Sequence, residues 1–194
     1  MMSEFWLYFD LGTEHILDIK GYDHILFVIS LCVLYSIVDW KKVLILVTAF
    51  TIGHSITLAL ATLGIITMDL RLIEFLIPVT IFITAVSNLF SSETVERSKV
   101  QINYIYASFF GLIHGMGFSS YLKSLLGSDT SIFTQLFAFN LGIEVGQILI
   151  VGVFLGVTAI FQSIFWVSKR DWIMIISSAI AGIALTIMIE NKFW

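Results

Sequence analysis

The sequence predicts an all-helical, polytopic membrane protein, and three observations support this prediction. Of the 194 residues, 58% are hydrophobic, and the mean hydropathy is +0.99. Only 12% of the residues are charged, which is about half the share of a typical soluble domain. Six apolar runs approach the roughly 20 residues that a helix needs to cross a hydrocarbon core of about 30 Å. We therefore expect one transmembrane domain covering residues 1–194.

Short polar segments separate the expected spans. The six spans cover residues 22–38, 42–66, 71–91, 103–125, 132–160 and 171–189. The fifth apolar run continues from Ile132 to Val167, which is long for one span and too short for two. We interpret it as one long tilted helix and leave open a break near Gly152 or Gly156.

Residues 3–19 differ from the six spans because they mix aromatic with acidic side chains. Asp10, Glu14 and Asp18 recur every four residues and so form one stripe along a helix. A helix with a charged stripe is better accommodated at the membrane interface than in hydrocarbon. We expect this segment to be an interfacial or re-entrant helix.

Basic residues are concentrated in alternate loops. The loops after the first, third and fifth spans hold Lys41, Lys42, Arg97, Lys99, Lys169 and Arg170. The positive-inside rule predicts that these loops face the cytoplasm and that both termini lie outside. The net charge is −4 and no basic patch is present, so no nucleic-acid partner is expected. The bilayer is the expected environment, and a homo-oligomer is left open.

Three ionisable side chains fall in the middle of expected spans, where a charge is costly and normally faces the protein interior. His54 lies midway along the second span, His114 midway along the fourth, and Glu144 near the middle of the fifth. At about 1.5 Å per residue, all three lie about 16–18 Å deep. We therefore predict that they meet at one level if their helices touch.

These residues, with Asp23 and His24 at the start of the first span, predict a divalent transition-metal site. Imidazole and carboxylate ligands suit nickel, cobalt, zinc or iron. The expected ligands are Asp23, His24, His54, His114 and Glu144, and the expected supporting residues are His15, Thr51, Ser55, Asn140 and Gln147. Supporting polar groups orient ligating imidazoles. A purely structural role in hydrogen bonding between helices stays open for each of them.

Four sequence blocks carry a resemblance to a known family. They are His15 followed by Gly21–Phe27 (GYDHILF), Thr48–Leu58 (TAFTIGHSITL), Phe110–Phe118 (FGLIHGMGF) and Phe139–Gln147 (FNLGIEVGQ). With these blocks the chain resembles the HupE/UreJ family of bacterial membrane proteins, and in particular its second branch. The resemblance implies a nickel or cobalt permease of the bacterial inner membrane, in which Asp23, His24 and His114 handle the metal.

The chain departs from the nickel permeases of this family at three positions. Ile16 stands where a proline follows the first histidine, Phe110 replaces a second histidine, and Gly117 replaces an acid. Compensation by His54 and Glu144 would make a different site, with a different metal or role.

The leading hypothesis is a metal permease in which the acidic N-terminal segment attracts a cation and the buried cluster holds it. The sequence shows no obvious polar track on the cytoplasmic side. The alternative is an intramembrane zinc-dependent hydrolase, in which zinc activates a water and Glu144 or Asp23 acts as general base. Haem ligation by two histidines and a packing role are further alternatives.

Overall fold

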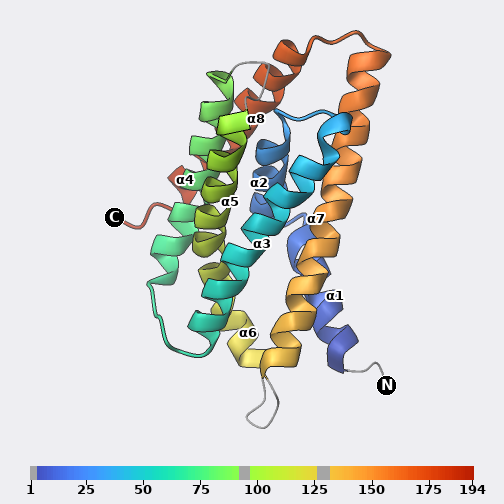
Figure 1. Cartoon of the computed structure of the whole chain (residues 1–194). Helices are drawn as coiled ribbons and strands as arrows, with labels where there is room; N and C mark the ends of the chain where they lie inside the picture. Colours follow the sequence, from blue (N-terminus) through green and yellow to red (C-terminus); the bar gives the residue numbers. More distant parts are fainter. Residues whose placement is uncertain (1–3, 92–96, 126–131) are drawn as a thin grey trace.

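The computed structural model describes residues 4–91, 97–125 and 132–194, with the side chains of all of these except 97–102, and its regular structure is helical (Figure 1). The helices are α1 (Glu4–Leu17), α2 (Asp23–Cys32), the short 3₁₀ helix η1 (Ile37–Asp39), α3 (Trp40–Thr62), α4 (Leu70–Leu89), α5 (Arg97–Gly117), α6 (Ser119–Leu125), α7 (Ile132–Ser163) and α8 (Lys169–Glu190).

The length and apolar character of the helices confirm the polytopic helical fold. Among the described residues, four segments are long and apolar enough to cross a membrane, namely Ile37–Thr62, Leu70–Leu89, Ile132–Ser163 and Lys169–Glu190. Helix α5 has 21 residues. The basic starts of α3 and α8 lie at the same end of the bundle, at the top of Figure 1.

Helices α1 and α2 follow each other in one direction as an interrupted crossing. Helix α1 starts at the lower end of Figure 1, and α2 continues into the upper half. With 14 and 10 residues, each is too short to cross a core of about 30 Å. The structure ends α2 at Cys32 rather than near residue 38. Asp39 accepts hydrogen bonds from the backbone and hydroxyl of Ser36, and this capping box starts η1 at Ile37.

Two pairs of helices pack backbone against backbone at glycines. A Cβ atom on Gly53 would overlap the Ser108 carbonyl oxygen, so α3 and α5 are in direct contact there. A Cβ atom on Gly12 would overlap the Phe139 carbonyl oxygen, which brings α1 equally close to α7. Small residues permit this close approach between membrane helices. The two contacts hold α3 and α5, which carry His54 and His114, together, and hold α1, which carries His15, against α7.

Helix α7 is continuous through both glycines at which a break was considered. Gly152 and Gly156 lie within its 32 residues, and a Cβ atom on either would meet nothing within 4 Å. A helix of this length measures about 48 Å, which exceeds the core thickness of about 30 Å and requires tilt. Figure 1 shows α7 running along one edge of the bundle.

The segment expected as one span over residues 103–125 is divided. Helix α5 ends at Gly117, and α6 begins at Ser119 after a break at Phe118. The Ser119 hydroxyl donates to the Met116 carbonyl at 2.9 Å across this break. His114 therefore lies one turn from the end of α5 rather than midway along a helix.

Candidate metal site

Three histidines from different helices meet inside the bundle. His15 lies near the end of α1, His24 near the start of α2, and His54 in the second half of α3. One ring nitrogen of each lies within 4.8 Å of the others. The exposed fraction is 5% for His24 and 0% for His54, and His15 is half-buried. We refer to these three residues as the histidine triad.

Four of the six ring nitrogens of the triad are buried without a hydrogen-bond partner. These atoms are Nε2 of His15, Nε2 of His24 and both nitrogens of His54. Buried polar atoms are normally paired, and leaving one unpaired costs about 1–3 kcal/mol. A metal ion accepts the lone pair of a neutral imidazole, so an ion among the three rings would satisfy one nitrogen of each. The donor set therefore fits a borderline divalent metal.

Asp23 orients the imidazole of His24. Its Oδ1 lies 3.1 Å from Nδ1 of His24 and also accepts the His24 backbone N–H at 2.9 Å. The carboxylate favours a proton on Nδ1, which leaves the lone pair on Nε2. Metal-ligating histidines commonly have such a carboxylate on the nitrogen away from the metal. Asp23 therefore acts on the triad through His24.

His114 lies directly behind the triad. Its ring centroid is 5.3 Å from that of His24, and its side chain is 1% exposed. The Thr80 hydroxyl donates to the Ile77 carbonyl at 2.7 Å and lies 3.2 Å from Nε2 of His114. Because the hydroxyl proton of Thr80 goes to Ile77, the Thr80 oxygen accepts the Nε2–H of His114. Nδ1 of His114 then keeps a lone pair and has no hydrogen-bond partner. His114 is thus placed to support His24 or to become a fourth ligand.

Glu144 lies apart from the histidines. It is outside the group of metal-ligating side chains that the described residues bring together, and it accepts a hydrogen bond from Thr48 at 2.5 Å. Gln147 accepts one from Thr51 at 2.8 Å. Ser55 and Asn140 donate to carbonyls of their own helices. The hydrogen bonds of these α7 side chains thus go to α3 or to α7 itself.

His15 was placed among the supporting residues by the sequence, and the structure puts it in the triad. The depth comparison treated every helix as a straight, complete span, whereas α1 stops midway beside α2 (Figure 1). A signal was present, because His15 follows Gly12 by one turn and Gly12 marks a close contact with α7. A histidine on the packed side of a helix points into the bundle.

Two phenylalanines cover one side of the triad. The Phe118 ring lies 4.0 Å from the His15 ring, and the Phe139 ring lies 5.7 Å from it, centroid to centroid. The two phenylalanine rings stack on each other at 5.1 Å. Because Phe118 occupies the break between α5 and α6, this apolar cover sits on a junction between helices.

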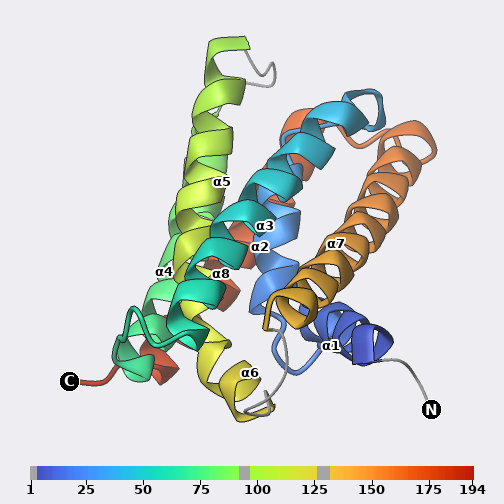
Figure 2. The ribbon, with the colours of Figure 1, turned by 60° about the horizontal axis from the view of Figure 1, so that its bottom comes forward.

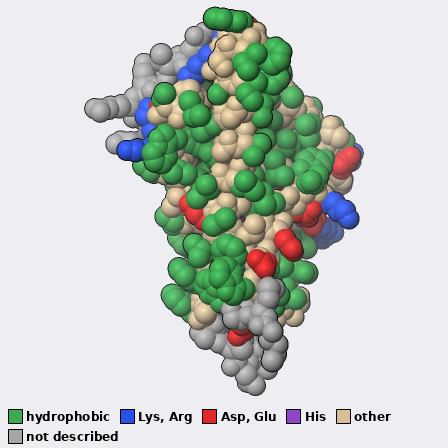
Figure 3. Space-filling view, turned by 90° about the vertical axis from the view of Figure 1, so that its right-hand side faces the viewer, with side chains coloured by type: hydrophobic (Ala, Val, Ile, Leu, Met, Phe, Trp, Pro, Cys, Tyr) green, Lys and Arg blue, Asp and Glu red, His purple; other side chains and the backbone are tan. Residues whose placement is uncertain are grey.

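An open pocket of about 650 Å³ adjoins this cover. Its lining residues come from α1, the segment after α1 and the start of α6, and they are Leu11, Thr13, Glu14, His15, Leu17, Asp18, Ile19, Lys20, Phe118 and Tyr121. Glu14 and Asp18 are exposed, and Figure 3 shows acidic side chains gathered on the face that α1 and α7 present. His15 belongs both to this pocket and to the triad, so the pocket leads from an acidic surface to the buried site.

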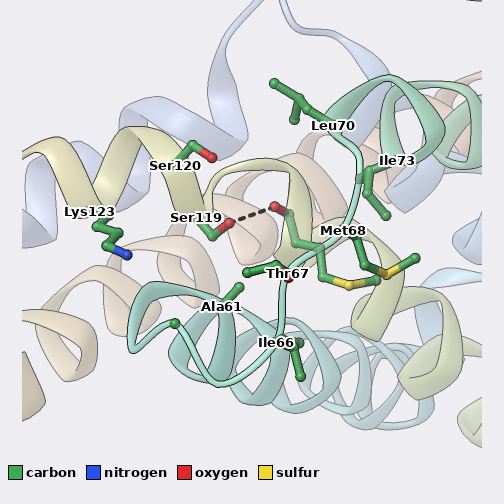
Figure 4. A pocket seen from close by; sticks show the side chains of 11 residues that line it. Ala61, Ile66, Thr67, Met68, Leu70, Ile73, Ser119, Ser120 and Lys123 are labelled. Carbon is green, nitrogen blue, oxygen red and sulfur yellow. Dashed lines mark hydrogen bonds between the residues drawn. The ribbon is translucent and has the colours of Figure 1, made fainter.

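A second pocket of about 150 Å³ lies between the α3–α4 connection and α6 (Figure 4). Its polar lining consists of hydroxyl groups and the ammonium group of Lys123, with no histidine or carboxylate. This composition does not favour a cation, so the triad is the better candidate for metal.

The fold and the site define a multi-pass membrane protein with a buried histidine cluster. A family model described as HupE / UreJ protein matches residues 1–191, nearly the whole chain, and the chain belongs to this family. The HupE/UreJ family consists of membrane proteins associated with nickel and cobalt transport. A search of curated proteins and a search of solved structures each returned no match.

Proposed function

We propose that this protein moves a divalent transition-metal ion, nickel or cobalt in the first place, across the membrane, and that the histidine triad holds the ion in transit. The observation that carries the proposal is the set of three imidazoles with converging, unpartnered nitrogens. Intramembrane ionisable residues without a structural partner are functional sites by default. Membership of a family associated with nickel and cobalt transport supports the same conclusion.

The interrupted crossing of α1 and α2 supports transport over static binding. His15 precedes the interruption and His24 follows it. Transporters often build ion sites from discontinuous helices near the middle of the bilayer, because the break frees polar groups for the ion. Two short helices also move relative to each other more easily than a continuous helix bends.

The acidic pocket supplies an approach to the triad. Glu14 and Asp18 would raise the local concentration of cations, as clefts of one charge sign do. Applied to the basic ends of α3 and α8, the positive-inside rule assigns that end of the bundle to the cytoplasm. The pocket and both termini would then belong to the outer side of a bacterial inner membrane.

An intramembrane zinc-dependent hydrolase is the second candidate. Catalytic zinc sites use three protein ligands and an open position for water, and the triad offers three imidazoles next to an open pocket. A hydrolase keeps its metal in place and need not move it across the membrane, whereas a permease delivers the ion to the far side.

The experiment that tests the proposal combines metal content with transport. The purified protein is analysed by inductively coupled plasma mass spectrometry, and nickel uptake is measured in proteoliposomes that contain a nickel-sensitive dye. We expect near-stoichiometric nickel and time-dependent uptake, both lost in His15→Ala, His24→Ala and His54→Ala. Thr158→Val is the control, because Thr158 is buried on α7 and bonds only to its own helix.

Folding of each variant is checked by gel filtration and thermal unfolding in detergent. A wild-type protein that takes up neither nickel nor cobalt and binds neither would refute the proposal. Tightly retained zinc without uptake would favour the hydrolase.

A further inference from the structure

A second group of polar side chains joins α3 to α7 beyond the triad. Thr48 donates to Glu144 at 2.5 Å, and Thr51 donates to Gln147 at 2.8 Å. Thr51 lies one turn before His54 on the buried side of α3. Thr48 lies one turn further back and is turned toward the exposed edge of the helix.

This group lies on the side of the triad that faces the basic end of the bundle. Thr48 precedes His54 by six residues, about 9 Å along α3, and α3 begins at the basic end. On α7, Glu144 follows Phe139, whose ring is 5.7 Å from the ring of His15. Because α7 runs toward the same end, both helices place Glu144 between the triad and the basic end.

Within the described part of the chain, no positive side chain pairs with Glu144. The ion pairs there are His24 with Asp23, Lys42 with Asp39, and Arg71 with Asp69. A carboxylate inside a membrane normally pairs with a positive group. Glu144 is half-buried and its partner Thr48 is exposed, so the carboxylate is not sealed inside the bundle.

Gln147, one turn after Glu144 on α7, completes the polar contact with α3. Its side chain is 0% exposed, and its Oε1 accepts from Thr51 at 2.8 Å. Its Nε2 is a donor and has no hydrogen-bond partner. We therefore assign Gln147 to the contact between the helices and not to the cation.

We propose that the carboxylate of Glu144, which accepts a hydrogen bond from Thr48, is a second stop for the divalent cation on its way from the histidine triad to the basic end. This inference rests on the proposed transport function and adds its release step. Oxygen ligands hold nickel and cobalt less firmly than imidazoles do. A transfer from the nitrogen site to the oxygen site therefore favours release over retention.

The competing explanation is a structural clamp between α3 and α7. Hydrogen bonds between membrane helices add modestly to the stability of helix packing. A clamp depends on the Thr48 hydroxyl as much as on Glu144, whereas a cation stop depends mainly on the carboxylate charge. Glu144→Gln removes the charge and keeps an acceptor for Thr48, and Thr48→Val keeps the charge and removes the donor.

The test measures bound nickel in detergent and initial nickel uptake in proteoliposomes for both variants. We expect Glu144→Gln to keep the wild-type nickel content of the triad and to lower the uptake rate about tenfold or more. Thr48→Val is expected to have a much smaller effect. Glu74→Gln is the matched control, because Glu74 is an exposed carboxyl of α4.

Each other outcome overturns the inference in a recognisable way. Unchanged uptake in Glu144→Gln rules out a second stop and leaves the proposed function intact. Loss of bound nickel in this variant assigns Glu144 to the first site instead. Equal loss of uptake in Thr48→Val identifies a clamp. A wild-type protein that neither binds nor transports nickel or cobalt refutes the transport function itself.

Discussion

Gly115 of α5 packs directly against the carbonyl oxygen of His54 on α3, and no side chain fits between the two backbones. The same glycine position also lies against the Thr57 hydroxyl. His54 is therefore held in place by backbone contact as well as by its own ring. The metal site depends on a glycine that has no ligand atom of its own.

The variant Gly115→Ala is expected to displace His54 and to lower both thermal stability and bound nickel. The added methyl group overlaps the backbone of α3, so the two helices must separate. Gly152→Ala is the matched control, because nothing lies within 4 Å of that position. In the control, replacing glycine within a helix is expected to stabilise by up to about 1 kcal/mol. Equal effects of the two substitutions would contradict the role of the α3–α5 contact.

Asp23→Asn is expected to weaken metal binding about 10- to 100-fold, which is the usual cost of losing a group that orients a metal-ligating histidine. The amide keeps the size of the side chain and removes the charge that favours a proton on Nδ1 of His24. Isothermal titration with nickel measures the change. Asp10→Asn, at an exposed position of α1, serves as control. An unchanged affinity would show that His24 is oriented by packing alone.

Replacing both acids of the open pocket, in Glu14→Gln/Asp18→Asn, is expected to slow nickel uptake at low metal concentration without reducing the nickel bound at saturation. The acids act through their field, so the difference from wild type is expected to shrink as ionic strength rises. Uptake rates at several salt concentrations test this. Glu190→Gln changes an exposed carboxyl at the end of α8 and is the control. A salt-independent defect would point to direct ligation instead.

Phe118→Ala is expected to open the triad toward the pocket. The Phe118 ring lies 4.0 Å from that of His15 and stacks on Phe139, so its removal exposes the imidazole. Bound nickel is then expected to pass faster to an added water-soluble chelator, which can be followed by absorbance. Phe133→Ala removes a ring that is 81% exposed and should leave the rate unchanged. An unchanged rate in Phe118→Ala would show that access follows another route.

Local sequence was sufficient to predict much of the fold. The apolar lengths predicted long helices at 42–66, 71–91, 132–160 and 171–189, and the structure has α3, α4, α7 and α8 there. Such lengths are set by the need to satisfy backbone hydrogen bonds within hydrocarbon, which is a property of each segment. The sequence also separated the helix over residues 3–19 from the span that starts at residue 22, and α1 ends at Leu17 before α2 begins at Asp23. The break at Phe118 was not visible in the same way, because hydropathy does not report a change of helix direction.

The histidines themselves were recognisable because polar groups in apolar spans are costly and therefore informative. Their grouping was recognisable in part, since the sequence placed His24, His54 and His114 in one site and their rings lie close together in the structure. His15 was counted as a supporting residue but joins His24 and His54, and Glu144 is hydrogen-bonded to Thr48. Depth along a straight helix gives only one coordinate of a side chain, whereas a group of metal ligands is defined by the positions of its side chains in three dimensions.

By itself, the sequence determined that this protein is a helical membrane protein of the HupE/UreJ type with buried histidines. The length of each apolar run and the polar residues within it are properties of one segment and can be identified from the sequence alone. Only the tertiary structure decided which side chains form the triad. That choice depends on where α1 stops and on how closely glycines let α3 approach α5 and α1 approach α7. These distances arise from packing between segments far apart in the chain, and no single segment encodes them.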